Sequence, residues 1–340
     1  MSQTPTVAMR HEATGPGVRL VLIALVLAGA VALPFVASGY QTFQLSQVVI
    51  YAIALLGLNI LTGVNGQISL GHGAFFAIGG YVAAILIVKF GAPYILAIPV
   101  AGLVCFGAGF LFGLPALRLG GLYLALATFA LALATPQLLK FKAFDAYTGG
   151  VQGLLLTKPK APIGIPLTRD QWLYFVCLAF AIPLFWAAAN LVHSRIGRAL
   201  IAIRDHPIAA ETMGVDASLY KTTTFGLSAA YTGIAGALMS LIVGFVSPDS
   251  FGLFLSLSFV VGIVVGGLAS IPGVIVGALF IEFIPNVADR ISDVIGESAK
   301  ALPWAIYGVL LILIMYAAPS GAAGLATKLT QAVVRRRGAR

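Results

Sequence analysis

Long apolar stretches recur along this chain, each close to the roughly 20 residues that a helix needs to cross a bilayer. Ten such stretches can be counted, at residues 18–37, 45–61, 70–88, 93–114, 121–139, 172–192, 222–246, 254–268, 273–288 and 302–317. Only 9% of the 340 residues are charged, against roughly 25% in an ordinary soluble domain. The sequence therefore predicts an all-α polytopic membrane protein with about ten transmembrane helices. Because several stretches are short or interrupted by glycine, eight or nine spans with broken or re-entrant helices also fit.

Lysine and arginine in the loops predict the orientation, because short cytoplasmic loops carry an excess of both. Basic residues occur in the tail 1–17, the loop 193–221 and the tail 319–340. Six spans before the loop and four after it place all three on one side, so we expect both termini in the cytoplasm and a transmembrane domain over 18–318. The segment 140–170 is then external although it is also basic, and its glycines and prolines indicate an ordered cap rather than a domain.

The net charge of +9 would raise the possibility of a nucleic-acid partner in a soluble protein. Here the densest basic cluster, at 335–337 and 340, lies beside apolar spans and indicates an anchor near anionic membrane lipid instead. We therefore expect no nucleic-acid partner. Cys105 and Cys177 both lie in apolar stretches, where a thiol usually behaves as a small hydrophobic group. We expect neither a disulfide framework nor a metal site.

Residues 57–81 join two apolar stretches through a concentration of glycine and polar side chains. Seven glycines occur in this segment, and backbone of this kind is tolerated at membrane depth only where protein or a cavity satisfies its polar groups. We therefore predict a broken or re-entrant helix that either lines a solute pathway or packs closely through its glycines. The candidate pathway residues are Asn59, Asn65, Gln67, Ser69, His72, Phe75 and Phe76. For His72, the alternatives are a structural hydrogen bond and a part in proton or ligand binding.

The loop 193–221 is the longest polar stretch predicted on the inner side. We predict two short helices in it, the first over 198–204 and the second beginning near Pro207, with Asp205 as its cap and Gly214 at its end. A short amphipathic helix of this kind suits docking in a groove of another protein. The alternative is a helix that rests on lipid headgroups.

The motifs of these two segments resemble the permease family of the ATP-binding-cassette importers for branched-chain amino acids, of the LivM type. In 57–81 the resemblance is carried by Ser69-Leu70-Gly71-His72 and Phe75-Phe76. Further matches occur at Gly197-Arg198-Ala199, Ile203-Arg204-Asp205, Ala209-Ala210, Gly214, Lys221, Ser228-Ala229, Ala235-Gly236, Gly149-Gly150-Val151 and Gly266-Gly267. In the wider importer class the loop carries a Glu-Ala-Ala-xxx-Gly pattern. Here Ile208 replaces the glutamate, while Ala209, Ala210 and Gly214 fit.

The resemblance implies a permease subunit in a bacterial cytoplasmic (inner) membrane. It would act with two ATP-binding subunits that bind ATP and Mg²⁺, a second related permease and an extracytoplasmic solute-binding protein. The solute would be Leu, Ile, Val or a related amino acid. The residues implied in coupling to the ATPases are Arg198, Arg204, Asp205, Ala209, Ala210, Gly214 and Lys221.

The energy source and the class of activity follow from motifs that the sequence lacks. No Gly-xxxx-Gly-Lys-Ser/Thr phosphate loop occurs, so we expect no ATP hydrolysis by this chain and no cofactor in it. No Ser/His/Asp grouping or His-Glu-x-x-His motif indicates an enzyme. Glu282 is the one clear acid inside a predicted span, which gives little support to ion coupling. The remaining alternative is a secondary transporter or facilitator of a small polar solute that needs no ATPase.

Overall fold

The computed structural model describes residues 16–116, 121–162, 166–295, 308, 309, 312, 316 and 321–324. Within these residues, eight helical segments are long and apolar enough to cross a membrane. They confirm an all-α polytopic membrane protein and match eight of the predicted spans. The first predicted span is also a helix, α1 (Pro16–Val36). It is not among the eight segments, because its apolar part is counted only over Ala24–Val36, which is shorter than a full span. The tenth, 302–317, lies outside the described residues except at 308, 309, 312 and 316.

Helices make up most of the described chain. After α1 come α2 (Gly39–Leu58), a π-helical turn η1 (Asn59–Val64), α3 (His72–Phe90), α4 (Tyr94–Ala116), α5 (Leu122–Leu139), α6 (Asp145–Thr148), β1 (Leu154–Leu155) and α7 (Arg169–His193). The second half contains α8 (Arg195–Asp205), α9 (Pro207–Thr212), α10 (Ala217–Val243), β2 (Phe245–Val246), α11 (Leu253–Gly266) and α12 (Ile271–Ile295). Short 3₁₀ turns lie at Lys142–Phe144, Gly150–Gln152 and Pro248–Phe251.

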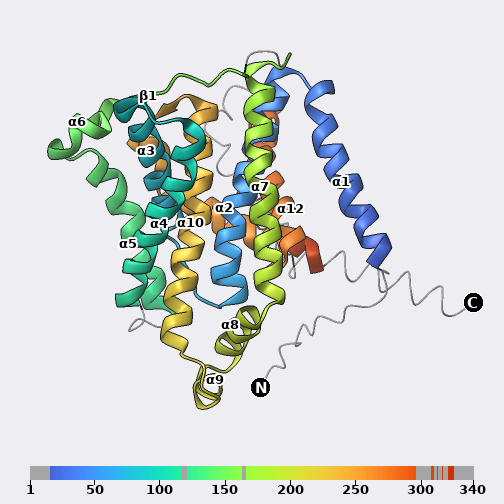
Figure 1. Cartoon of the computed structure of the whole chain (residues 1–340), viewed down its shortest axis with the longest axis vertical. Helices are drawn as coiled ribbons and strands as arrows, with labels where there is room; N and C mark the ends of the chain where they lie inside the picture. The colour runs from blue at the N-terminus through green and yellow to red at the C-terminus, as the bar shows by residue number, and fades with distance from the viewer. Residues whose placement is uncertain are drawn as a thin grey trace, which may run out of the picture.

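The two ends of the helix bundle differ in structure (Figure 1). At one end, α8 and α9 form a small hairpin that projects beyond the long helices. At the opposite end, β1 and β2 pair in antiparallel register, with Leu154 opposite Val246. Ion pairs link Lys140 to Asp249 and Lys158 to Asp170 at this end. These contacts hold the described part of the segment 140–170 against this end of the bundle; its place outside the membrane stays a prediction.

Helix α10 lies at the centre of the bundle, where it packs most extensively against α4, α3 and α2. Glycines allow these close approaches: a Cβ at Gly79 of α3 would collide with the backbone of Gly233, and one at Gly236 with the carbonyl of Phe76. Helices α11 and α12 meet in the same way, because Gly266 and Gly273 lie against each other's carbonyl groups. Small residues at crossings are the usual means by which transmembrane helices pack.

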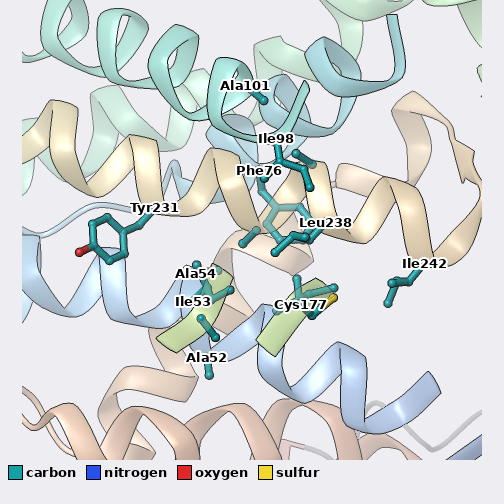
Figure 2. Packing of buried hydrophobic residues seen from close by; sticks show 14 of the residues in the cluster. Ala52, Ile53, Ala54, Phe76, Ile98, Ala101, Cys177, Tyr231, Leu238 and Ile242 are labelled. Atoms are coloured by element: carbon teal, nitrogen blue, oxygen red, sulfur yellow. The ribbon is translucent and has the colours of Figure 1, made fainter. Parts of the chain in front are cut away.

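Apolar side chains from these helices fill the space around α10 (Figure 2). Phe76 of α3 lies beside Leu238 of α10 and near Ile98 of α4. Ile53 of α2 belongs to the same buried cluster, as does Cys177 of α7. Both cysteines are free and buried, as expected of thiols in apolar stretches. The core therefore joins helices from both halves of the chain.

Candidate functional site

The predicted helix break lies between α2 and α3. Helix α2 continues into the π-helical turn η1, and the backbone N–H of Asn65 then donates to the carbonyl of Ile60 at 3.1 Å. Residues 65–71 are not helical, and α3 begins at His72. Single π-helical turns are uncommon and often occur at functional sites. The structure thus locates the break predicted within 57–81 at residues 59–71.

Hydroxyl groups from distant helices satisfy the backbone of this break. The N–H of Leu70 donates to Oγ1 of Thr128 on α5, and the N–H of Gly73 donates to Oγ of Ser256 on α11, both at 2.9 Å. Each hydroxyl replaces a hydrogen bond that a continuous helix would have supplied. Irregular backbone at membrane depth requires such partners, and sequence reasoning did not identify either residue.

Six of the seven candidate pathway residues are buried in the single chain. Asn59, Asn65, Ser69, His72, Phe75 and Phe76 are each 2% exposed or less, whereas Gln67 is partly exposed. Phe75 packs edge-on against Phe225, and Phe76 packs against Phe251 and Phe259. The two phenylalanines therefore face different parts of the core. Their role in a pathway stays a prediction.

His72 joins three segments through a chain of hydrogen bonds. Its Nε2 lies 2.6 Å from Oγ of Ser228 on α10, and its Nδ1 lies 2.9 Å from Oγ of Ser69. The Ser228 hydroxyl donates to the carbonyl of Gly57 at 2.6 Å. A hydroxyl has one proton to donate, so Ser228 accepts from His72 Nε2–H, and the neutral ring accepts from Ser69 at Nδ1. These hydrogen bonds support the structural alternative for His72, with hydroxyl groups as the direct partners of the ring; a part in proton or ligand binding stays untested.

Asn59 fixes the turn between α11 and α12 to the helix break. Its Oδ1 accepts from the N–H of Ala269 at 2.9 Å, and its Nδ2 donates to the carbonyl of Ser270 at 3.2 Å. Ala269 has φ 61°, the one positive φ of a non-glycine residue in the described part of the chain. A strained backbone of this kind persists only where its surroundings fix it. Asn59 is thus a bidentate clamp on a strained turn.

Asn65 differs from its neighbours because its side chain makes no hydrogen bond to the described residues. Both its Oδ1 and its Nδ2 are buried and lack a partner. A buried amide without partners is costly and usually has a partner such as water or a bound ligand. Among the predicted pathway residues, Asn65 is therefore the one whose buried amide has no partner among the described residues; its role in a pathway stays a prediction.

The α8–α9 hairpin corrects two details of the predicted loop. The first helix begins at Arg195 rather than at 198, because the Ser194 side chain caps it by accepting from the N–H groups of Ile196 and Gly197. Asp205 does not cap α9: the residue before Pro207 is His206, and no side chain caps this helix. The Asp205 carboxylate instead accepts from Arg204 Nε at 2.9 Å. The carboxylate that the sequence pattern assigned to the cap of α9 is therefore paired with the neighbouring Arg204.

The remaining coupling candidates divide into buried and exposed residues. Ala210 is 5% exposed and packs with Ile203 and Ala217 inside the hairpin. Gly214 has φ 83° and follows the end of α9, in agreement with its predicted place. Lys221 belongs to α10, where its carbonyl accepts from Gln67 Nε2 at 3.3 Å. Arg198 and Ala209 are exposed.

Two large apolar side chains on the hairpin are exposed over most of their surface. Ile208 is 79% exposed and Met213 is 85% exposed. Exposed apolar groups that cluster at one place often mark a protein contact.

Sequence comparisons agree with this architecture. Residues 41–318 match the model of a family described as branched-chain amino acid transport system, permease component. The chain is 32% identical to the high-affinity branched-chain amino acid transport system permease protein LivM of Salmonella typhimurium, over 89% of this chain and 74% of that protein. It is 26% identical to the permease protein BraD of Pseudomonas aeruginosa, over 81% of this chain and 91% of that protein. No solved structure was found to match.

The family match covers the helix break, the hairpin and the central helices α3, α4 and α10. It also agrees with the multi-pass architecture, in which eight described segments can cross a membrane. The chain therefore belongs to the family of permease components of branched-chain amino acid transport systems.

Proposed function

We propose that this chain is the permease subunit of an ATP-binding-cassette importer that moves branched-chain or related amino acids into a bacterial cell. The observation that carries this proposal is the pair of exposed apolar side chains, Ile208 and Met213, on a hairpin beyond the end of the spans. A short helix with such a surface suits the groove of a partner protein. Family membership supports an ATP-binding subunit as that partner.

The proposed complex contains two ATP-binding subunits, a second related permease and an extracytoplasmic solute-binding protein. ATP and Mg²⁺ bind to the ATP-binding subunits, and this chain supplies no catalytic group. The α8–α9 end, the N-terminus and the C-terminus lie in the cytoplasm, whereas the β1–β2 end faces the solute-binding protein. The basic residues in loop 193–221 and in both tails support this orientation.

The helix break at 59–71 and the first turn of α3 are proposed to line the solute pathway. A zwitterionic amino acid crosses the membrane only along polar groups, because an apolar barrier cannot replace its hydration. Asn65 supplies such a group, since both of its amide atoms lack a partner among the described residues. The remaining hydrogen bonds of the break hold the backbone in place around it.

Ile208→Asp is expected to weaken binding of the ATP-binding subunits, because a carboxylate would be buried in an apolar contact. The co-purified amount of ATP-binding subunit should fall at least about tenfold, which corresponds to about 1.4 kcal/mol. The fold of the permease should persist because Ile208 is 79% exposed. Pull-down from detergent-solubilised complex, with the permease as bait, measures this change.

Val151→Asp is the matched control, because Val151 is also an exposed apolar residue, 66% exposed, but belongs to the opposite end of the bundle. It should leave the binding of the ATP-binding subunits unchanged. If Ile208→Asp binds them as well as the wild type does, α9 is not the docking helix.

A further inference from the structure

Arg204, in the last turn of α8, makes a long-range contact with the helix break. Its Nη1 donates to the carbonyl of Gly63 in η1 at 2.8 Å, across 141 positions of sequence. Its Nε donates to Asp205 at 2.9 Å, which fixes the orientation of the guanidinium plane. Helical carbonyls near a C-terminal end carry partial negative charge and attract a cation. Arg204 therefore bonds the hairpin to the π-helical turn.

The aliphatic part of the same side chain lies on Gly66. This glycine has φ 75°, and a Cβ placed on it would lie 2.5 Å from Cγ of Arg204. Only a residue without a side chain permits both the backbone conformation and the close approach. One residue of the hairpin thus contacts the break at two points, Gly63 and Gly66.

A second hydrogen bond joins the break to α10, the helix that follows the hairpin. Gln67 Nε2 donates to the carbonyl of Lys221 in the first turns of α10. On its other side, the π-helical turn is attached through Asn59 to the turn at Ala269 and Ser270. The break therefore lies between the hairpin and the α11–α12 turn, with side-chain hydrogen bonds to both.

We propose that Arg204 is a positioning residue that transmits movement of the α8–α9 hairpin to the helix break at 59–71. The guanidinium group is rigid and holds several donors in one plane, so a displacement of α8 moves Gly63 and Gly66 with it. A π-helical turn interrupts the regular α-helical hydrogen bonding, and such turns are frequent at functional sites. Arg204 thus contacts the helix break, whereas Ile208 and Met213 are exposed residues of the same hairpin that are proposed to contact the ATP-binding subunit. This inference rests on the proposed function.

The test uses the complete transporter complex in proteoliposomes, with solute uptake and ATP hydrolysis measured on the same vesicles. In Arg204→Ala the ATP-binding subunits should remain bound, and hydrolysis stimulated by the solute-binding protein should persist. The ratio of solute taken up to ATP hydrolysed should fall about tenfold, a typical size for coupling between sites. Arg204→Lys retains the charge but not the planar fork, so its ratio should be intermediate.

Gly66→Ala perturbs the same contact from the opposite side and should lower the ratio by a similar factor. Because both variants break the same contact, the ratio in the double variant should be little lower than in either single variant. Arg195→Ala is the matched control, since Arg195 is an exposed arginine at the start of the same helix. Its ratio should equal that of the wild type.

A normal ratio in both Arg204→Ala and Gly66→Ala would overturn the inference. If Arg204→Ala does not assemble, Arg204→Lys and Gly66→Ala decide the question by the same ratio. A wild-type complex that takes up solute without hydrolysing ATP would instead overturn the proposed function, and this inference with it. An additive double variant would show that Arg204 and Gly66 act separately and would also contradict the inference.

Discussion

Gly236→Leu is expected to prevent stable folding of this chain. A Cβ at position 236 would collide with the carbonyl of Phe76, and the N–H of Gly80 lies nearby. Backbone atoms of two packed helices cannot move aside as a flexible side chain can, so α3 and α10 would have to separate. Overpacking of a well-packed core typically costs about 1–3 kcal/mol, and a leucine forced between two backbones should reach or exceed the upper value.

Thermal unfolding and size-exclusion profiles of the purified protein measure this loss. Gly107→Leu is the matched control, because Gly107 lies in the middle of α4 and a Cβ there meets nothing within 4 Å. The control should keep the melting temperature of the wild type. A Gly236→Leu protein as stable as that control would show that the close approach of α3 and α10 is wrong.

His72→Leu is expected to destabilise the chain by about 3 kcal/mol. The leucine would leave the Ser69 hydroxyl without its acceptor and would remove the donor to Ser228 in a fully buried place. A buried polar group that loses its partner costs about 1–3 kcal/mol, and here two groups are affected. His72→Gln can supply one acceptor and one donor, so it should retain most of the stability.

The comparison of His72→Gln with His72→Leu also separates a structural histidine from a proton carrier. A glutamine can keep the two hydrogen bonds but cannot carry a proton. If His72 is structural, uptake by a stable His72→Gln variant should therefore remain close to that of the wild type. Chemical unfolding and uptake by the reconstituted complex measure the two properties. Lost uptake at full stability would favour proton or ligand binding by His72.

The sequence predicted those features that depend on local composition. The apolar stretches located the spans, because burial in lipid requires a continuous apolar length. Glycines and polar groups at 57–81 located the helix break, and Gly214 located the end of α9 at its positive φ. The polar loop 193–221 likewise contains the two short helices that were expected.

Contacts between distant residues could not be predicted from one sequence. His72 meets Ser228 across 156 positions and Asn59 meets Ala269 across 210, and no local pattern indicates either pairing. The Asp205 cap was wrong for a local reason, because His206 is the residue before Pro207 and the Asp205 carboxylate accepts from Arg204 instead. Buried hydroxyls in apolar spans, such as Ser228 and Thr128, were the available signal for partners of the break.

The rate at which single cysteines in the helix break react, with and without ATP, tests the central claim most directly. The claim is that the partner ATPases open and close a polar solute pathway that the helix break of this chain lines. Cysteines would replace Asn65, Gln67, Ser69 and Phe75 one at a time, in a protein whose Cys105 and Cys177 have been replaced. Ala54→Cys is the buried control, since Ala54 is 0% exposed in the core, and it should stay unreactive.

In the complete complex, small polar thiol reagents should label Asn65→Cys and its neighbours at rates that change when ATP is bound. A pathway that opens and closes exposes these positions in one state and covers them in the other. If all four cysteines stay unreactive in every nucleotide state while the complex remains folded, the break is packing structure and the pathway lies elsewhere. Rapid labelling at the same rate with and without ATP would contradict control by the ATPases.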